Sequence, residues 1–242
     1  MSGPKARKSN SEKIANDHQP RLAKRTIEAV TFDVGGTLIQ CWPSVGHVYA
    51  DIATSYGHRH LSPAVLNHRF KTAWRNFKNF HHTQAHWAAL VDTTFQGLIE
   101  PLPSKTFFPE LFARFAEPGA WQIFEDVIPT LEALKDRGIR LGIISNWDDR
   151  LRPLLGNLKL NSYFQTIVVS CEVGAPKPSR RMFATACDAL GCSPANILHV
   201  GDSREMDFEG SLDAGLQARW LRRGARRCAA MTITALSSLN KL

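Results

Sequence analysis

Several polar side chains of the sequence directly follow a run of apolar and β-branched residues, the pattern of a buried strand that ends in a polar group. Asp33, Ser145 with Asn146, Ser170 and Asp202 each lie just beyond such a run. In an open α/β sheet, ligands bind outside the carboxyl ends of the strands. We therefore expect these side chains to meet at one edge of a sheet, where they can act on a ligand.

Three carboxylates belong to this pattern. Asp33 and Asp202 end two predicted strands, and Asp207 follows five residues after Asp202. Carboxylates and a loop carbonyl are oxygen ligands that Mg²⁺ accepts beside water and the phosphate oxygens of a substrate. The glycines Gly35 and Gly36 let the chain turn tightly after Asp33. Asp207 has an alternative interpretation, because an aspartate at the start of a helix also complements the helix dipole.

The remaining polar groups favour an anionic ligand. Ser145 and Asn146 offer side-chain and backbone donors. Lys177 lies between Pro176 and Pro178, whose rings stiffen the loop. A lysine held in this way supplies a fixed positive charge to a phosphate or to a developing anion.

Strand and helix patterns alternate through most of the chain, which predicts right-handed βαβ units and a doubly wound parallel sheet covered on both faces. The expected strands are 27–32, 140–145, 166–170, 197–200, 217–221 and 232–234. The expected helices between them are 128–137, 148–158, 179–190 and 205–214. The predicted fold class is therefore α/β, with a Rossmann-like sheet.

Between the first strand and the others, the sequence is rich in aromatic residues and has a helical period. Helices are expected over 45–56, 62–77, 87–98 and 104–115, which together make an all-α insert. An insert at the mouth of a catalytic strand is suited to act as a lid. We interpret Trp74, Phe77 and Trp87 as the core of this insert and not as a substrate site.

The positive charge is concentrated at the N-terminus. The chain of 242 residues has a net charge of +8, and residues 1–26 hold seven Lys or Arg against Glu12 and Asp17, which gives +5 of that +8. This segment has almost no apolar spacing and is predicted to be a disordered basic tail. The rest of the chain is only mildly basic, so the charge does not require a nucleic-acid partner.

The composition indicates a soluble, cytoplasmic protein. No apolar run approaches the roughly 20 residues of a membrane span, and no signal-peptide pattern occurs at the start. The five cysteines form no CxxC pair, which argues against a disulfide framework or a zinc site. We expect a small-molecule substrate, no nucleic-acid or membrane partner, and a monomer or homodimer. The expected domains are the tail 1–26, a core of 27–41 with 120–242, and the helical insert 42–119.

Together these stretches resemble the haloacid dehalogenase (HAD) superfamily, and within it subfamily IA, whose helical C1 cap follows the first motif. The resemblance covers residue 27 to about residue 239. The matching motifs are Asp33-Val34-Gly35-Gly36-Thr37, Ser145 at the end of its strand, Lys177-Pro178, and Gly201-Asp202 with Asp207.

The resemblance implies a mechanism for the matched residues. Asp33 would be the nucleophile and form an aspartyl-phosphate, with Lys177 as the second catalytic residue. Mg²⁺ would be held by four residues: Asp33, the carbonyl of Gly35, Asp202 and Asp207. The phosphoryl oxygens would be positioned by another four: Thr37, Ser145, Asn146 and Lys177. The implied activity is hydrolysis of a small phosphate monoester.

One position departs from the family pattern. Phosphatases of the family carry a second aspartate two residues after the nucleophile, which protonates the leaving group, and this chain has Gly35 there. General acid–base catalysis contributes roughly 10²–10⁴-fold, so its loss weakens the phosphatase reading without abolishing it. His47 is a hypothetical substitute donor, and Asp148 or Asp149 is another, although a helix-capping role fits the two aspartates better.

Three alternatives remain open. Dehalogenases of the family also lack the second aspartate, but their fourth motif lacks the acid that Asp202 supplies here. Phosphonatases need a lysine early in the cap, and no lysine occurs between Asp33 and Phe70. In the third alternative, the protein binds a phosphate or a partner without turnover.

Overall fold

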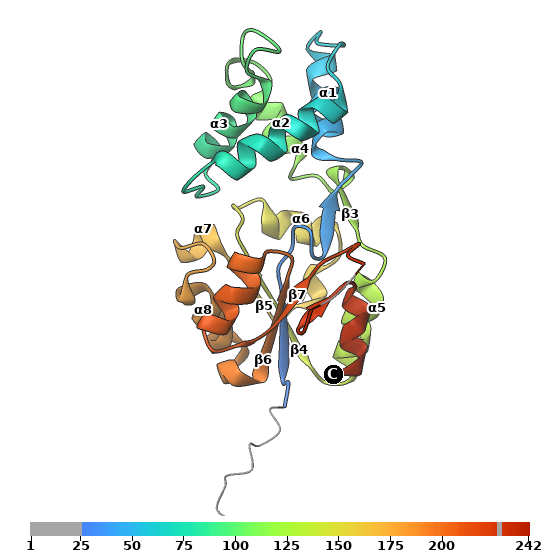
Figure 1. The fold of residues 1–242 in the computed structure, drawn as a ribbon, viewed down its shortest axis with the longest axis vertical. Coiled ribbons are helices and arrows are strands. Elements are labelled where there is room, and N and C mark those ends of the chain that lie inside the picture. The colour runs from blue at the N-terminus through green and yellow to red at the C-terminus, as the bar shows by residue number, and fades with distance from the viewer. Residues whose placement is uncertain (1–25, 227–228) are drawn as a thin grey trace, which may run out of the picture.

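The computed structural model describes residues 26–226 and 229–242. The predicted basic tail therefore lies outside the described residues, apart from Thr26. The central element is a six-stranded sheet in the order β5-β4-β1-β6-β7-β8, in which every pairing is parallel (Figure 1). Its strands are β1 (Ala29–Phe32), β4 (Arg140–Ser145), β5 (Thr166–Val169), β6 (Ile197–Gly201), β7 (Gln217–Leu221) and β8 (Thr232–Ile233). The predicted parallel α/β fold is confirmed.

Helices cover both faces of the sheet, because alternate strand residues point to opposite sides. Val30 and Phe32 of β1 are fully buried in a cluster with α5 (Val127–Asp136) and α6 (Leu151–Asn157). Ala29, the neighbour of Val30, belongs instead to a cluster with α8 on the other face. The remaining helical pieces of this part are α7 (Ser170–Val173), α8 (Arg180–Leu190), α9 (Gly210–Asp213), and short 3₁₀ turns η3 (Asn161–Tyr163), η4 (Pro194–Asn196) and η6 (Leu236–Lys241).

Four helices between β2 (Ile39–Cys41) and β3 (Trp121–Ile123) form a separate group, the α1–α4 group, which stands at one end of the sheet (Figure 1). They are α1 (Val45–Ser55), α2 (Pro63–Asn76), α3 (Gln84–Phe95) and α4 (Phe108–Arg114), with 3₁₀ turns η1 (Pro103–Lys105) and η2 (Pro118–Ala120). Their starts follow the sequence: Ser44 and Thr83 cap α1 and α3, and Pro63 opens α2. The group has its own buried cluster, in which the ring of Tyr49 stacks on Phe95 with centroids 5.6 Å apart.

Two short strands join this group to the sheet and were not predicted. β2 (Ile39–Cys41) pairs antiparallel with β3 (Trp121–Ile123), so the chain leaves and returns through one narrow ribbon. Three-residue strands are too short to show a period of two in the sequence.

Several predicted boundaries also need correction. The strand expected to reach Ser170 ends at Val169, and α7 begins at Ser170. The helix expected over 148–158 begins only at Leu151, because the Asp148 side chain accepts the Arg150 backbone N–H at 3.1 Å. The helix expected over 205–214 is a π-helical segment, η5 (Arg204–Glu209), followed by α9. Among the described residues, no helix has both the length and the apolar character that crossing a membrane requires.

Candidate active site

The sheet brings the predicted side chains to one edge because β1 lies between β4 and β6. Asp33 directly follows β1, Ser145 is the last residue of β4, and Asp202 directly follows β6. The three strands are parallel and in register, with Phe32 opposite both Ile143 and Val200. Their carboxyl ends therefore converge, as the sequence pattern predicts.

Lys177 lies at the centre of this edge. Its ammonium donates hydrogen bonds to Asp33 Oδ1 at 2.7 Å, to Asp207 Oδ1 at 2.5 Å and to the Ile144 carbonyl at 2.8 Å. The Lys177 side chain is 2% exposed and that of Asp207 is equally buried. A buried ammonium needs such partners, since an unpaired buried charge is very costly.

Ser145 and Asn146 fix this arrangement from β4. The Ser145 hydroxyl donates to Asp33 Oδ1 at 3.1 Å, the same oxygen that Lys177 contacts. The Asn146 amide makes two hydrogen bonds to the Lys177 backbone: Oδ1 accepts the N–H at 2.6 Å, and Nδ2 donates to the carbonyl at 3.1 Å. Asn146 thus holds the lysine loop against the strand end, although the sequence had suggested it as a ligand for phosphate.

Asp207 turns its carboxylate into the site. Besides Lys177, it accepts the Ser203 backbone N–H at 2.9 Å through Oδ2. Its Oδ1 lies 3.3 Å from His199 Nε2, and His199 Nδ1 lies 2.9 Å from the Thr31 hydroxyl. The network is satisfied when the neutral imidazole carries its proton on Nε2, donates to Asp207 and accepts from Thr31.

His199 is a residue whose role the sequence reasoning missed. It is 1% exposed in the middle of β6, below the carboxylates, and connects Asp207 to β1. The signal was present in the sequence, because a histidine interrupts the apolar strand Ile197–Val200 just before Gly201 and Asp202. A buried polar residue in an apolar strand needs a partner, and here the partner belongs to the site.

Two glycines make room for carboxylates. Gly36 has a left-handed φ of +75°, and a Cβ added there would lie 2.4 Å from Asp202 Oδ2. A Cβ added at Gly201 would lie 2.2 Å from Asp207 Cγ. Any side chain at either position would displace an acidic group, so both glycines belong to the construction of the site.

Asp33, Asp202 and Asp207 form one acidic group, whose nearest oxygens all lie within 4.8 Å of one another. Desolvation by the surrounding protein, with the negative charges of Asp33 and Asp207, raises the pKa of Asp202 to about 7, although part of the residue is exposed. Burial also raises the pKa of Asp33, against the opposing effect of Lys177. Burial opposes ionisation of Asp207 too, but Lys177 and His199 outweigh it and hold the pKa of that carboxyl far below its usual range. Burial by itself would lower the pKa of Lys177, but the two carboxylates beside it raise it above its usual value.

This donor set fits a hard divalent cation. Three closely spaced carboxylates repel one another when they are ionised, and a cation bound between them relieves this repulsion. Mg²⁺ takes one or two carboxylates and keeps waters and phosphate oxygens as its other ligands. Gly35, whose carbonyl the family resemblance assigns to the metal, lines the same cavity as these aspartates.

Thr37 is placed differently from the other predicted residues. It is fully buried and is not among the residues that line the cavity. Its carbonyl accepts from Arg223 at 2.8 Å, while its hydroxyl has no hydrogen-bond partner within the described part of the chain. The expected contact of Thr37 with a phosphoryl group therefore has no support from its position.

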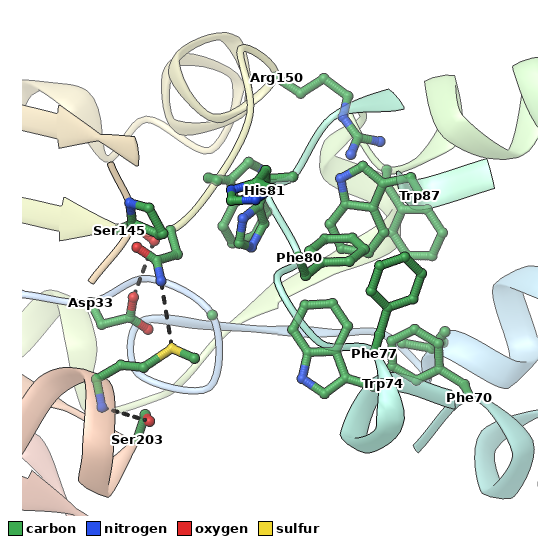
Figure 2. A pocket seen from close by; sticks show the side chains of 18 of the residues that line it. Asp33, Phe70, Trp74, Phe77, Phe80, His81, Trp87, Ser145, Arg150 and Ser203 are labelled. Atoms are coloured by element: carbon green, nitrogen blue, oxygen red, sulfur yellow. Dashed lines mark hydrogen bonds between the residues drawn. The ribbon is translucent and has the colours of Figure 1, made fainter. Parts of the chain in front are cut away.

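A cavity of about 900 Å³ extends from Asp33 to the α1–α4 group. Trp74, Phe77 and Trp87 line it, and Figure 2 shows them across the cavity from Asp33 and Ser145. Trp74 is 40% exposed. The interpretation of these three residues as only the core of the helical insert is therefore corrected: they form part of the wall of the candidate site.

The alternative proton donors do not enter the site. His47 is exposed at the start of α1, bonds to Ser44 Oγ at 2.7 Å and is not among the residues that line the cavity. Asp148 is buried in an ion pair with Arg150 at 2.6 Å and accepts the indole N–H of Trp87 at 2.8 Å. Asp149 is exposed beside it.

The sequence and the fold match known proteins. A family model described as haloacid dehalogenase-like hydrolase matches residues 27–215. Haloacid dehalogenase-like hydrolase domain-containing protein 3 of Mus musculus is 32% identical over 203 residues, which are 79% of this chain and 80% of the relative. Glyceraldehyde 3-phosphate phosphatase of Methanopyrus kandleri is 33% identical over 107 residues, 42% of this chain and 44% of that protein. The crystal structure of a HAD phosphatase from Thermococcus onnurineus has a TM-score of 0.65 and 27% identity, and the match covers 89% of this chain and 97% of that one.

Proposed function

This chain belongs to the haloacid dehalogenase-like hydrolases, and on that basis we propose that it is a Mg²⁺-dependent phosphatase acting on a small phosphate monoester. The observation that carries the proposal is the ammonium of Lys177, held 2.7 Å from Asp33 and 2.5 Å from Asp207 at the edge of a three-carboxylate group. This arrangement combines a nucleophile, a cation site and a fixed positive charge, the parts that phosphoryl transfer requires.

In the proposed reaction, an oxygen of Asp33 attacks phosphorus. A bond forms between that oxygen and phosphorus, the bond from phosphorus to the ester oxygen breaks, and the leaving group takes the electron pair. Water then hydrolyses the aspartyl-phosphate, releases phosphate and regenerates the Asp33 carboxylate. Mg²⁺, when bound by Asp33, the Gly35 carbonyl, Asp202 and Asp207, would neutralise charge between the carboxylate and the phosphoryl group.

The chain's own residues prepare Asp33 for this attack. Lys177 and Ser145 both donate to Oδ1, which fixes the orientation of the carboxylate. All three Lys177 hydrogens and the Ser145 hydroxyl hydrogen are engaged before a substrate binds, so in the proposed reaction these donors turn from their present partners to the phosphoryl oxygens. Asn146 keeps the Lys177 backbone in place. The fold thus positions these donors beside Asp33 in advance, which limits the rearrangement that the reaction requires.

Gly35 limits this chemistry. It cannot supply the proton that the second aspartate of the family would give to the leaving group. A Cβ at this position would lie 3.4 Å from the ring of Trp147, so that ring borders the space a side chain would take. We infer that the enzyme depends on leaving groups that depart without a side-chain acid at this position.

The α1–α4 group is proposed to act as a cap domain over the site, with 42–119 as the cap and 27–41 with 120–242 as the core. Its separate buried cluster and its two-strand connection support this division. The shared cavity supports enclosure of a small molecule between the two parts.

The phosphatase names of the Methanopyrus and Thermococcus proteins support a phosphatase over a dehalogenase. The acidic group points the same way. Asp202 forms with Asp33 and Asp207 a group of carboxylates that could hold a metal ion, and a halide leaving group has no need of one.

Release of phosphate from acetyl phosphate and from p-nitrophenyl phosphate tests the proposal. Both leaving groups depart without a proton, so Gly35 does not mask turnover. We expect release that requires Mg²⁺ and falls by at least about 10³-fold in Asp33→Asn, because the nucleophile is lost. A thermal unfolding curve of the variant checks that it is folded. Equal release by both proteins would refute the aspartyl-phosphate route.

A further inference from the structure

The cavity joins two chemically different surfaces. At one end lie the carboxylates and Lys177, which handle the phosphoryl group in the proposed function. At the other end lie five aromatic side chains of the α2–α3 segment, which we call the aromatic wall: Phe70, Trp74, Phe77, Phe80 and Trp87 (Figure 2). A substrate that reaches Asp33 with its phosphate therefore meets this wall with its other end.

The rings of the aromatic wall pack on one another and hold their positions. Trp74 and Trp87 stack with centroids 5.7 Å apart and an interplanar angle of 22°. Phe80 meets Trp87 edge-on at 4.7 Å and Phe77 edge-on at 5.0 Å. Despite this packing, 40% of the Trp74 surface remains exposed. Such a wall provides a preformed flat apolar surface, which suits a planar ring by offset stacking or edge-to-face contact.

Polar side chains also line the cavity beside the wall, among them Arg75, Asn79 and His81. Arg150 lines the cavity, but its guanidinium is paired with Asp148 at 2.6 Å and donates to the Phe112 carbonyl at 2.7 Å. His82 lines it with a ring that is 9% exposed, and burial lowers its pKa to about 4, so it is uncharged at neutral pH. The Arg150 guanidinium is therefore already paired, and the rings of the wall offer an aromatic substrate a contact that needs no hydrogen bond.

The chemistry at Gly35 points to the same class of substrate. With no acid at this position, the leaving oxygen must carry its negative charge as it departs. A phenolic oxygen, with a pKa of about 10, accepts that charge far more readily than an alkoxide, whose conjugate acid resembles water with a pKa of about 15.7. The wall and the glycine are independent features of the sequence, and both favour an aryl ester.

We propose that the site takes phosphate monoesters of aromatic alcohols, with the ring against the aromatic wall and the phosphate at Asp33; the proposal rests on the phosphatase function above. In the balanced reaction, Asp33 takes the phosphoryl group and the aryl oxide leaves with the electron pair and gains a proton from solvent. Water then cleaves the aspartyl-phosphate, so that ester and water yield a phenol and phosphate.

Binding tests this proposal without turnover. In Asp33→Asn protein, titration calorimetry compares 2-naphthyl phosphate, butyl phosphate and inorganic phosphate. We expect the naphthyl ester to bind at least about tenfold more tightly than the butyl ester, because one or two aromatic contacts stabilise a complex by about that factor. Trp74→Ala in the same background should remove most of that difference. Equal affinities for the two esters would overturn the proposal.

Tyr56→Ala is the matched control. Tyr56 is 47% exposed, close to the 40% of Trp74, and it belongs to the α1–α4 group without lining the cavity. It should leave the naphthyl preference intact. Trp74→Leu keeps apolar volume and guards against a folding defect in the alanine variant. If neither Trp74 variant changes the preference, the wall does not recognise the ring.

Turnover separates recognition of the ring from departure of the oxygen. Benzyl phosphate carries a ring on an alkyl oxygen, phenyl phosphate on an aryl oxygen, and butyl phosphate has no ring. We expect kcat/KM to be highest for phenyl phosphate. If kcat/KM for benzyl phosphate equals that for phenyl phosphate, the proposal is overturned in favour of a ring on an alkyl ester.

If acetyl and butyl phosphates are hydrolysed as well as phenyl phosphate, the phosphatase function stands and this inference falls. If aryl esters bind selectively but no ester is hydrolysed, the phosphatase function fails alone.

Discussion

Lys177 shows at the level of one residue how the site is held together. Its ammonium is buried, and it contacts two of the three carboxylates of the acidic group. Removing either side of such a buried network leaves an uncompensated charge, which commonly costs 3–5 kcal/mol. The lysine therefore serves stability and chemistry with the same hydrogen bonds, and the prolines beside it and the Asn146 amide limit its movement.

Gly35 allows a gain-of-function prediction. Gly35 does not adopt a left-handed φ, and the nearest atom to an added Cβ is in the Trp147 ring at 3.4 Å, so a side chain fits with a small shift. Gly35→Asp should supply the missing proton donor. We expect kcat/KM for butyl phosphate to rise by about 10- to 100-fold, part of the roughly 10²–10⁴-fold that general acid catalysis contributes. The value for p-nitrophenyl phosphate should change by less than about threefold, since its leaving group needs no proton.

Gly35→Asn is the control for this substitution, because the amide has nearly the same shape and donates no proton to the leaving group. It should leave the hydrolysis of butyl phosphate at the original level. The same increase in both variants would show that crowding against Trp147, and not proton transfer, had changed the rate.

At the scale of elements, the parallel sheet was predictable because each strand has a strong local signal. β4 and β7 have the predicted ends, Arg140–Ser145 and Gln217–Leu221. The polar residues at the strand ends followed from the same signal, since parallel strands share one functional edge. The β2–β3 ribbon was not predictable, because it arises from pairing between residues about 80 positions apart in the sequence. The π-helical segment at Arg204–Glu209 has no signal in the sequence that distinguishes it from an α-helix.

The aromatic wall was misread for a related reason. Helical periodicity identifies the face of a helix that avoids water, but it does not tell whether that face meets another helix or a cavity. Trp74 packs on Phe70 and also lines the cavity, so both interpretations fit the same spacing. Only the position of the α1–α4 group over the sheet edge distinguishes them.

An ion pair of the core contacts the α1–α4 group through both of its partners, which supports a prediction on stability. Asp148, which follows β4, accepts the indole N–H of Trp87 from α3 and pairs with Arg150, whose guanidinium lies 3.5 Å from the Phe112 ring of α4. The Asp148 and Arg150 side chains are only 7% and 11% exposed. Asp148→Ala should therefore lower the free energy of unfolding by about 3 kcal/mol, measured by urea denaturation.

Asp149→Ala removes the same charge from the adjacent exposed position and should change the free energy of unfolding by less than about 0.5 kcal/mol. If the two variants lose equal stability, the connection through Asp148 does not hold the α1–α4 group to the core.

For the whole molecule, the acidic group makes stability depend on pH and on metal together. The pKa of Asp202 rises from 3.8 to about 7 in the folded, metal-free protein, so the folded state holds one proton more than the unfolded state between these values. The contribution of Asp202 to the free energy of unfolding is therefore complete below about pH 4 and is lost as the pH rises through about 7. The pKa values of His82 and His199 are lowered by burial. These two histidines therefore reduce the free energy of unfolding as the pH falls below about 6.5, which opposes the effect of Asp202.

The increase in Tm caused by Mg²⁺ reports on the acidic group and on His199, which contacts Asp207, because the contribution of the more distant His82 cancels when the metal-free and metal-loaded proteins are compared at one pH. Mg²⁺ needs ionised carboxylates, so at low pH its binding must first displace the proton of Asp202. We expect millimolar Mg²⁺ to raise Tm clearly at about pH 8 and much less at about pH 5.5. Asp202→Asn should raise the Tm of the metal-free protein at the higher pH, since a repelling charge is removed, and should abolish most of the Mg²⁺ effect. A Mg²⁺ effect of the same size at both pH values, or one that survives in Asp202→Asn, would mean that the metal binds elsewhere.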